Sequence, residues 1–250
     1  MASRAAGSST WVRCYQPAPE AATRLLCFPH AGGSASYFLP FARDLAPHVE
    51  VLAVQYPGRQ DRRSEPCVDD LRTLADLTTE QLRPWLDRPL ALFGHSMGAT
   101  LAYEVANRLE RSGTRPVALI ASGRRAPSRH RAENIHLLDD QGLIADVRRL
   151  SGTDNQILDD EEVLRMVLPS IRSDYKAAET YRYRPEPKLH CSVVAMTGDH
   201  DPQVSIEEAG AWSEHTAGTF ELRVFPGGHF FINRHSSQVT AEIRARLARS

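Results

Sequence analysis

The pentapeptide at residues 94–98, Gly-His-Ser-Met-Gly, constrains the fold of this chain more than any other feature. It directly follows an apolar run at 90–93, and a helix-like segment rich in Ala, Leu and Glu follows it to about residue 109. A Gly-x-Ser-x-Gly turn between a strand and a helix is the pattern of a nucleophile elbow, which exposes the serine hydroxyl. Gly94 and Gly98 leave room for close backbone contacts that a Cβ atom would block. The pattern also fits a simpler structure, a tight turn with Ser96 as a helix N-cap.

Short apolar runs alternate with helix-like segments along most of the chain. The runs that read as buried strands are 24–28, 49–55, 90–93, 117–122, 192–197 and 220–225. The helical segments between and after them are 37–45, 71–86, 99–112, 206–214 and 237–248. This alternation predicts an α/β fold with a mostly parallel central sheet flanked by helices. A length of 250 residues favours one domain, 1–250, over two.

One interval, about 124–187, contains no strand-like run. It opens as a loop and then shows three helical patterns, at 138–150, 159–166 and 168–181, before Pro185 and Pro187 end it. We expect a helical insertion here that serves either as a lid or as ordinary packing on the core. The small polar residues 1–10 are expected to form a disordered tail.

Composition excludes several classes of function. A net charge of -1 is unlike that of a general nucleic-acid binder, which is normally basic. The sequence has no apolar run long enough to cross a membrane and no signal-peptide core near residue 1. The spacing of the four cysteines matches no metal or redox motif. These features predict a protein of the reducing cytoplasm with no membrane or nucleic-acid partner.

A nucleophilic serine needs a base within hydrogen-bond reach, and His229 is the best candidate among the ten histidines. It follows the last predicted strand in a Pro-Gly-Gly loop, where the chain order Ser, Asp, His places the base. His235 lies at the start of the final helix, His95 lies inside the elbow, and His30 lies in an early glycine-rich loop. These three positions make them weaker candidates.

The acid that orients the base is expected in the loop after the 192–197 strand. Asp199 and Asp201 both lie there. We favour Asp201 because it lies further out, before a proline that stiffens the loop, whereas Asp199 directly follows the strand and suits a turn. Either residue also fits an Asx turn without a catalytic role.

An acyl-transfer site also needs N–H donors for an oxyanion. One is the backbone N–H of Met97, the residue after the serine. The second is expected from the loop 28–34, whose glycines let backbone N–H groups face the site, and Ala31 is the candidate by its place in that loop. The alternative is a glycine-rich turn capped by Ser34 and nothing more.

Taken together, several blocks of sequence resemble the type II thioesterases, the stand-alone editing enzymes of polyketide and nonribosomal peptide synthesis. The similarity covers nearly the whole chain after about residue 11, and the blocks that carry it are 27–34, 54–59, 93–99, 198–202 and 225–231. The resemblance implies an α/β-hydrolase core with a helical lid. It implies hydrolysis of acyl thioesters on phosphopantetheinylated acyl or peptidyl carrier proteins, which removes aberrant or stalled acyl groups.

The family pattern assigns the catalytic triad to Ser96, Asp201 and His229, and the oxyanion donors to the backbones of Ala31 and Met97. It implies no metal and no dissociable cofactor. A monomer is expected.

The sequence also offers candidate residues for contacts with the acyl group and with the carrier protein. Apolar lid residues are candidates to line an acyl channel, although each also fits ordinary packing: Leu143, Ile144, Val147, Leu164, Met166 and Val167. Carrier proteins tend to be acidic, so two arginine clusters are candidate docking surfaces. These are Arg59, Arg62 and Arg63, and Arg124, Arg125, Arg129 and Arg131.

Three other functions share parts of this pattern. A small-molecule carboxylesterase or lipase, or an acyltransferase, would use the same triad. A non-enzymatic interaction subunit on the same scaffold would have lost a triad member, and none is missing here.

Overall fold

A computed structural model describes residues 10–151 and 161–248. Seven strands form one sheet in the order β1-β3-β2-β4-β5-β6-β7. All neighbouring pairs are parallel except β1 with β3. The strands are β1 (Val12–Arg13), β2 (Thr23–Phe28), β3 (Val49–Val54), β4 (Leu90–His95), β5 (Ala118–Ser122), β6 (Ser192–Gly198) and β7 (Phe220–Phe225). The predicted mostly parallel α/β fold is confirmed.

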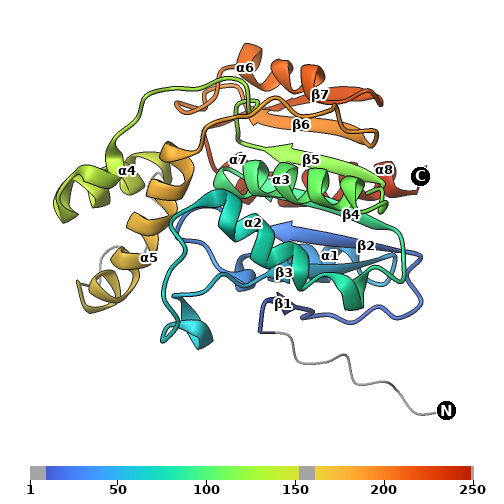
Figure 1. Cartoon of the computed structure of the whole chain (residues 1–250), viewed down its shortest axis with the longest axis horizontal. Helices are drawn as coiled ribbons and strands as arrows, with labels where there is room; N and C mark the ends of the chain where they lie inside the picture. Colours follow the sequence, from blue (N-terminus) through green and yellow to red (C-terminus); the bar gives the residue numbers. More distant parts are fainter. Residues whose placement is uncertain (1–9, 152–160, 249–250) are drawn as a thin grey trace.

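Helices cover both faces of the sheet (Figure 1). The α-helices are α1 (Leu39–Leu45), α2 (Leu71–Glu80), α3 (Met97–Arg111), α4 (Asp140–Ser151), α5 (Glu161–Thr180), α6 (Ile206–Gly210), α7 (Phe231–Arg234) and α8 (Ser236–Leu247). Short 3-10 helices occur at Ala35–Phe38, Gln60–Arg62, Arg83–Trp85, Ile135–Leu137 and Ala211–His215. Among the helices of the described ranges, none combines the length and the apolar character needed to span a bilayer.

The core lies in two layers because side chains alternate across each strand. On β2, Leu26 and Phe28 pack with α2 and α3, whereas Leu25 and Cys27 pack with α1 and α8. Figure 1 shows α2 and α3 in front of the sheet and α1 and α8 behind it. This arrangement buries both faces of the parallel strands and leaves the strand ends for the loops that form the site.

The strand predictions from sequence agree with the structure to within two residues at each end. The antiparallel edge strand β1 was not predicted, because two residues carry no measurable periodicity. Two long helical predictions were wrong in their extent. The 71–86 segment is α2 followed by a separate 3-10 turn at Arg83–Trp85, and the 206–214 segment is α6 followed by another at Ala211–His215.

The described residues between β5 and β6 include two α-helices, α4 and α5, which lie beyond one end of the strands in Figure 1. The prediction of separate helices at 159–166 and 168–181 was wrong, because α5 continues through Pro169. Leu164 and Leu168, on either side of that proline, pack into one cluster with Leu143 of α4, and this shared packing favours a continuous helix. Residues 159 and 160 of the first predicted segment, and residues 1–9 of the predicted tail, lie outside the described residues.

Candidate active site

The turn between β4 and α3 holds Ser96 in a strained backbone conformation, with φ 55° and ψ −123°. The flanking glycines make this turn possible. A Cβ atom on Gly98 would lie 2.1 Å from the carbonyl oxygen of Phe28, and one on Gly94 would lie 2.1 Å from the carbonyl oxygen of Gly98. The Ser96 N–H donates to the Ser122 carbonyl at 2.8 Å, which fixes the turn against β5. Strain of this kind costs on the order of 1–3 kcal/mol and is concentrated at functional sites.

His229 lies in the loop between β7 and α7, and its ring joins the serine to a carboxylate. Its Nε2 is 3.0 Å from Ser96 Oγ, and its Nδ1 is 2.9 Å and 3.1 Å from the two carboxylate oxygens of Asp201. The His229 residue is 3% exposed and the Asp201 side chain is fully buried. When Nδ1–H donates to Asp201, Nε2 is left as the acceptor for the Ser96 hydroxyl, which is the arrangement that a general base needs.

The two acidic candidates of the loop after β6 have different partners. Asp201 faces His229 and also accepts the Gln203 N–H at 2.8 Å. Asp199 accepts the Gly227 N–H at 2.8 Å, and this bond lowers the pKa of its exposed carboxyl. Asp199 thus connects the β6 and β7 loops, and the structure brings Asp201 to the imidazole.

The two N–H groups predicted for an oxyanion belong to Ala31 and Met97, which line the same cavity as Ser96 and His229. Within the described ranges, neither N–H takes part in a hydrogen bond. Met97 is the first residue of α3, where the N–H groups are unpaired and the helix dipole favours negative charge. Both donors are therefore available to a ligand.

The three rival histidines lie near the site but make no contact of the kind a base needs. The His95 ring packs against the rings of His229 and His30, and His95 Nδ1 is 3.0 Å from Ser122 Oγ. Burial, together with the neighbouring His229, lowers the pKa of His30 to about 3 and that of His95 well below its ordinary value. Both rings therefore stay neutral at physiological pH. His235 bonds to the Pro226 carbonyl and to Gln238.

A cavity of about 1490 Å³ lies above Ser96, between the sheet and the α4–α5 insertion. Three of the predicted lid residues line it, Val147, Met166 and Val167. For the other three the packing alternative holds: Leu143 and Leu164 form the packing cluster of α4 and α5, and Ile144 packs against it. The cavity wall combines these apolar side chains with polar ones, among them Arg63, Arg124, Arg149 and Glu179.

Most arginines of the two predicted clusters are paired with acidic side chains. Arg59 and Arg62 are buried and paired with Asp174 and Glu65. In the second cluster, the arginines at 125, 129 and 131 form ion pairs with Glu133, Glu214 and Glu208. Opposite charges nearby neutralise these five arginines, and sequence alone could not reveal those partners. The other two, Arg63 and Arg124, line the cavity.

Two side chains that tie the Ala31 region to neighbouring helices were not among the sequence candidates. Asp174 of α5 accepts the Gly32 N–H at 2.7 Å and so contacts the loop that carries Ala31. Tyr37 donates to Asn233 at 2.6 Å, which links that loop to α7. The available signal for Asp174 was an acid placed between Ile171 and Tyr175, on the apolar face of a predicted helix.

No group of three His, Cys, Asp or Glu side chains within 10–151 and 161–248 is arranged to hold a metal ion.

A mostly parallel sheet with a serine elbow after one strand, and with Asp and His on loops after later strands, defines the α/β-hydrolase class. Within this class, the family model of the thioesterase domain matches residues 23–247, and the chain belongs to that family.

Similar proteins are themselves thioesterases. The probable cadicidin biosynthesis thioesterase of Streptomyces griseus is 55% identical over 240 residues, covering 96% of this chain and 66% of that protein, so this chain spans just under two thirds of it. Thioesterase PikA5 of Streptomyces venezuelae is 51% identical over 242 residues, covering 96% of this chain and 86% of that protein. The solved structure of the type II thioesterase BorB from the borrelidin biosynthetic cluster matches with a TM-score of 0.92 and 53% identity, covering 96% of this chain and 98% of that one.

Proposed function

We propose that this protein hydrolyses acyl thioesters on phosphopantetheinylated acyl or peptidyl carrier proteins, and so removes aberrant or stalled acyl groups during polyketide or nonribosomal peptide synthesis. Membership of the thioesterase family and similarity to PikA5 and BorB support this function. The observation that carries the chemistry is the 3.0 Å contact between His229 Nε2 and Ser96 Oγ at the floor of a large cavity.

The reaction has two acyl-transfer steps. Ser96 Oγ attacks the thioester carbonyl while His229 takes its proton, and Asp201 stabilises the imidazolium that forms. The N–H groups of Ala31 and Met97 stabilise the oxyanion, the protonated pantetheine thiol leaves, and an acyl-enzyme remains on Ser96. Water, activated by His229, then releases the free acid and restores the serine. His229 carries the proton in both steps, from the serine to the leaving thiol and then from water to the serine. The scheme therefore uses no metal or cofactor.

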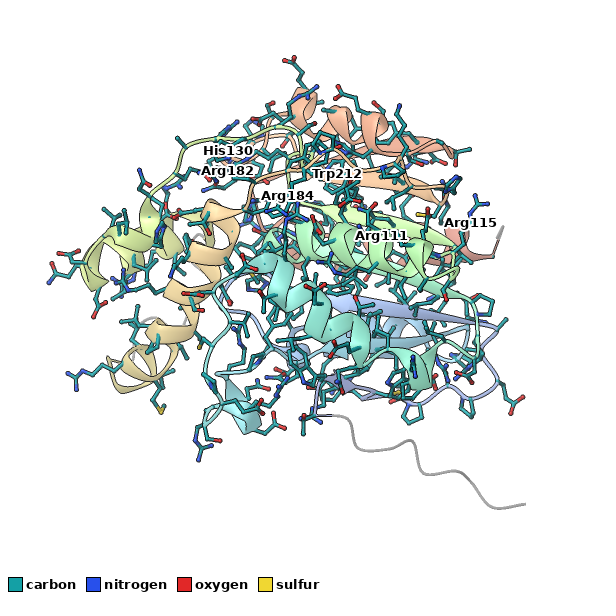
Figure 2. All side chains as sticks on the ribbon, viewed as in Figure 1. Arg111, Arg115, His130, Arg182, Arg184 and Trp212 are labelled. Atoms are coloured by element: carbon teal, nitrogen blue, oxygen red, sulfur yellow. The ribbon has the colours of Figure 1, made fainter. Side chains whose placement is uncertain are left out.

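The partner in this proposal is an acidic carrier protein. We assign its docking to four exposed arginines outside the predicted clusters, at 111, 115, 182 and 184, of which Arg111 is paired with Glu186. Figure 2 shows these four side chains on one face, over α3 and the segment that follows α5. We further propose that the protein acts as a monomer in the cytoplasm.

Turnover of matched substrates tests the function. An acyl group is presented as a carrier-protein thioester and as a simple oxygen ester, and the released products are identified. We expect faster release from the carrier thioester, with the free acid as product. Preference for the oxygen ester would favour a carboxylesterase, and an ester or amide product would indicate an acyltransferase. The Ser96→Ala variant is expected to lose turnover while remaining folded, and full turnover by it would contradict the scheme.

A further inference from the structure

A buried ion pair connects helix α5 to the loop that carries Ala31. Asp174 and Arg59 form a two-pronged pair, with Arg59 nitrogens at 2.6 Å and 2.8 Å from the two carboxylate oxygens. The side chains of Arg59 and Asp174 are 7% and 1% exposed. A pair removed from water in this way costs desolvation energy, which is recovered only when further hydrogen bonds satisfy both groups.

Those further bonds go to the glycines of the loop. Asp174 Oδ2 accepts the Gly32 N–H at 2.7 Å, and Arg59 Nη1 donates to the Gly33 carbonyl at 3.0 Å. The pair therefore holds the backbone on both sides of the Gly32–Gly33 peptide. A Cβ atom on Gly32 would lie 2.7 Å from Ile171 of α5, so the helix also packs directly against this loop.

The loop passes this constraint on to Ala31. The Gly33 N–H donates to the His30 carbonyl at 2.9 Å. That carbonyl belongs to the same planar trans peptide as the Ala31 N–H, and the two groups point in opposite directions. Fixing the His30 carbonyl therefore fixes the direction of the Ala31 N–H toward the cavity.

We propose that Asp174 and Arg59 are positioning residues that keep the Ala31 N–H aimed at the oxyanion, so that the oxyanion hole is complete only while α5 is seated on the core. This inference rests on the proposed role of Ala31. It makes the insertion between β5 and β6 part of the catalytic arrangement as well as the roof of the acyl cavity.

Steady-state kinetics of Asp174→Asn test this inference. Asparagine keeps an oxygen acceptor but loses the charge that holds Arg59. Removal of one oxyanion donor lowers kcat by ~10²–10³-fold in other enzymes, and misplacement of a reacting group by an ångström can cost ~10²-fold. We therefore expect kcat to fall by about 10- to 100-fold, with KM changed by less than about threefold. A boronic acid inhibitor, whose tetrahedral adduct occupies the oxyanion hole, should lose affinity by a similar factor.

Lys176→Ala is the matched control, because Lys176 lies on the same helix and forms an ion pair with Asp69 away from the loop. We expect this variant to keep kcat and inhibitor affinity. An equal loss in both variants would mean that general seating of α5 matters and would overturn the specific role of Asp174. A rise in KM with unchanged kcat, or unchanged kinetics, in Asp174→Asn would overturn it as well.

Two further measurements separate this inference from misfolding and from the proposed function. The double variant Arg59→Met with Asp174→Leu replaces the pair by apolar groups, so it should fold while still showing the kcat loss. Full activity in this folded variant would contradict the inference. Assays with a p-nitrophenyl ester report the oxyanion hole independently of any carrier. A wild-type protein that cleaves the ester but no carrier thioester would refute the proposed function, and the Asp174 comparison would still be decisive.

Discussion

At the scale of single residues, the site depends on close backbone contacts that few side chains allow. Ser96 adopts a left-handed φ of 55°, and the backbone of Gly98 approaches the end of β2. The Gly-x-Ser-x-Gly pattern follows from these two constraints, which is why sequence alone could locate the elbow.

Gly98→Ala should destabilise the fold, because the added Cβ would lie 2.1 Å from the Phe28 carbonyl oxygen, where only backbone movement can relieve the clash. We expect a loss of at least about 2 kcal/mol in the free energy of unfolding, measured by urea denaturation. Gly210→Ala is the control, because nothing lies within 4 Å of that Cβ position and the backbone is helical. It should be neutral or stabilise by up to about 1 kcal/mol. Equal losses in both variants would refute the steric explanation.

Buried histidines should make the protein less stable in acid. Burial lowers the pKa of His215 to about 4, whereas the same residue in the unfolded chain titrates near 6.5. The unfolded state therefore takes up a proton between these pH values and the folded state does not, so this stability is complete above about pH 6.5 and is lost as the pH falls toward 4. His30, whose pKa is lowered to about 3, acts in the same direction.

The His215→Gln variant isolates one of these histidines, because glutamine can still bond to Ser128, which lies 2.9 Å from His215 Nε2. Between pH 7 and pH 5 the free energy of unfolding should fall less in the variant than in the wild type, by on the order of 1 kcal/mol. An identical loss in both proteins would rule out His215 as a contributor.

Sequence placed both acidic candidates in one loop and favoured Asp201 by its position, but it could not show the partner of either. Asp199 and Asp201 differ in which neighbour they meet, and those neighbours, Gly227 and His229, arrive from the next strand. The Arg59–Asp174 pair joins residues separated by 115 positions, so no local pattern could have indicated it.

At the scale of elements, the α4–α5 insertion divides into a side that packs on itself and a side that faces the cavity. Leu143 and Leu164 form the packing side, and Val147 and Val167 line the cavity. Helical periodicity predicted apolar faces here but could not distinguish these sides, because both are apolar. Pro169 misled the prediction further, since a proline usually ends a helix and here lies inside one.

Val147→Phe should shorten the acyl cavity. We expect kcat/KM for long acyl chains to fall by about tenfold or more relative to short ones. The phenylalanine ring would occupy the space that the last methylenes of a long chain need. A turnover series of increasing chain length on one carrier protein measures this effect. Leu143→Ala is the contrast: it should cost about 2–4 kcal/mol of stability and leave chain-length preference unchanged. The same preference in wild type and Val147→Phe would exclude this wall as the acyl site.

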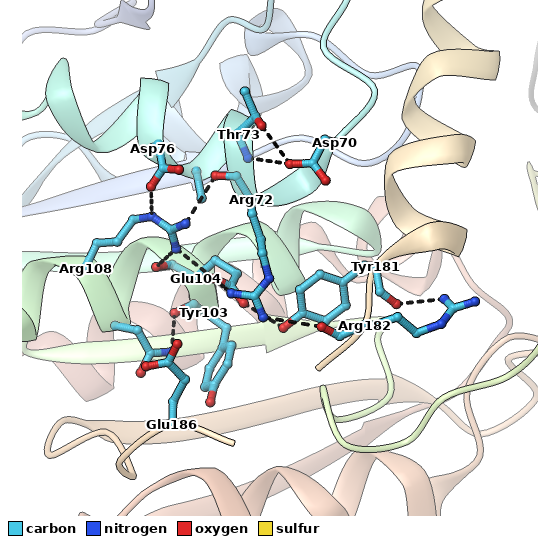
Figure 3. A network of polar contacts seen from close by, with 12 residues as sticks. Asp70, Arg72, Thr73, Asp76, Tyr103, Glu104, Arg108, Tyr181, Arg182 and Glu186 are labelled. Carbon is cyan, nitrogen blue, oxygen red and sulfur yellow. Dashed lines mark hydrogen bonds and ion pairs between the residues drawn. The ribbon is translucent and has the colours of Figure 1, made fainter. Parts of the chain in front are cut away.

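At the scale of the whole molecule, a buried carboxylate joins three parts of the chain. Glu104 of α3 accepts from Arg72 of α2 at 3.3 Å, from Arg108 at 2.7 Å and from the Tyr181 hydroxyl, beyond α5, at 2.7 Å (Figure 3). The Glu104 side chain is 2% exposed. The mostly parallel sheet followed from the alternation of strands and helices, whereas the strand order and this polar junction depend on tertiary contacts and were not predicted.

Glu104→Gln should lower the free energy of unfolding by about 3 kcal/mol, because it removes the charge that compensates buried parts of two arginines. Glu186→Gln, which alters the more exposed pair with Arg111, should cost less than about 1 kcal/mol. Urea denaturation compares the two variants. Glu104 does not line the cavity, so kcat of the folded variant should stay within about twofold of wild type. Similar stability losses in the two variants would contradict the structural role of Glu104.

The proposed mechanism depends on a covalent acyl group on Ser96, whose Oγ lies 3.0 Å from Nε2 of the base His229. Rapid-quench mass spectrometry of the wild-type protein mixed with an acyl-carrier thioester measures this intermediate directly. We predict a transient mass increase equal to the acyl group, mapped to the peptide that contains Ser96 and absent from Ser96→Ala, with the carrier recovered as its free thiol. Hydrolysis that proceeds with no acyl group on Ser96, or with the group on another residue, would contradict the account.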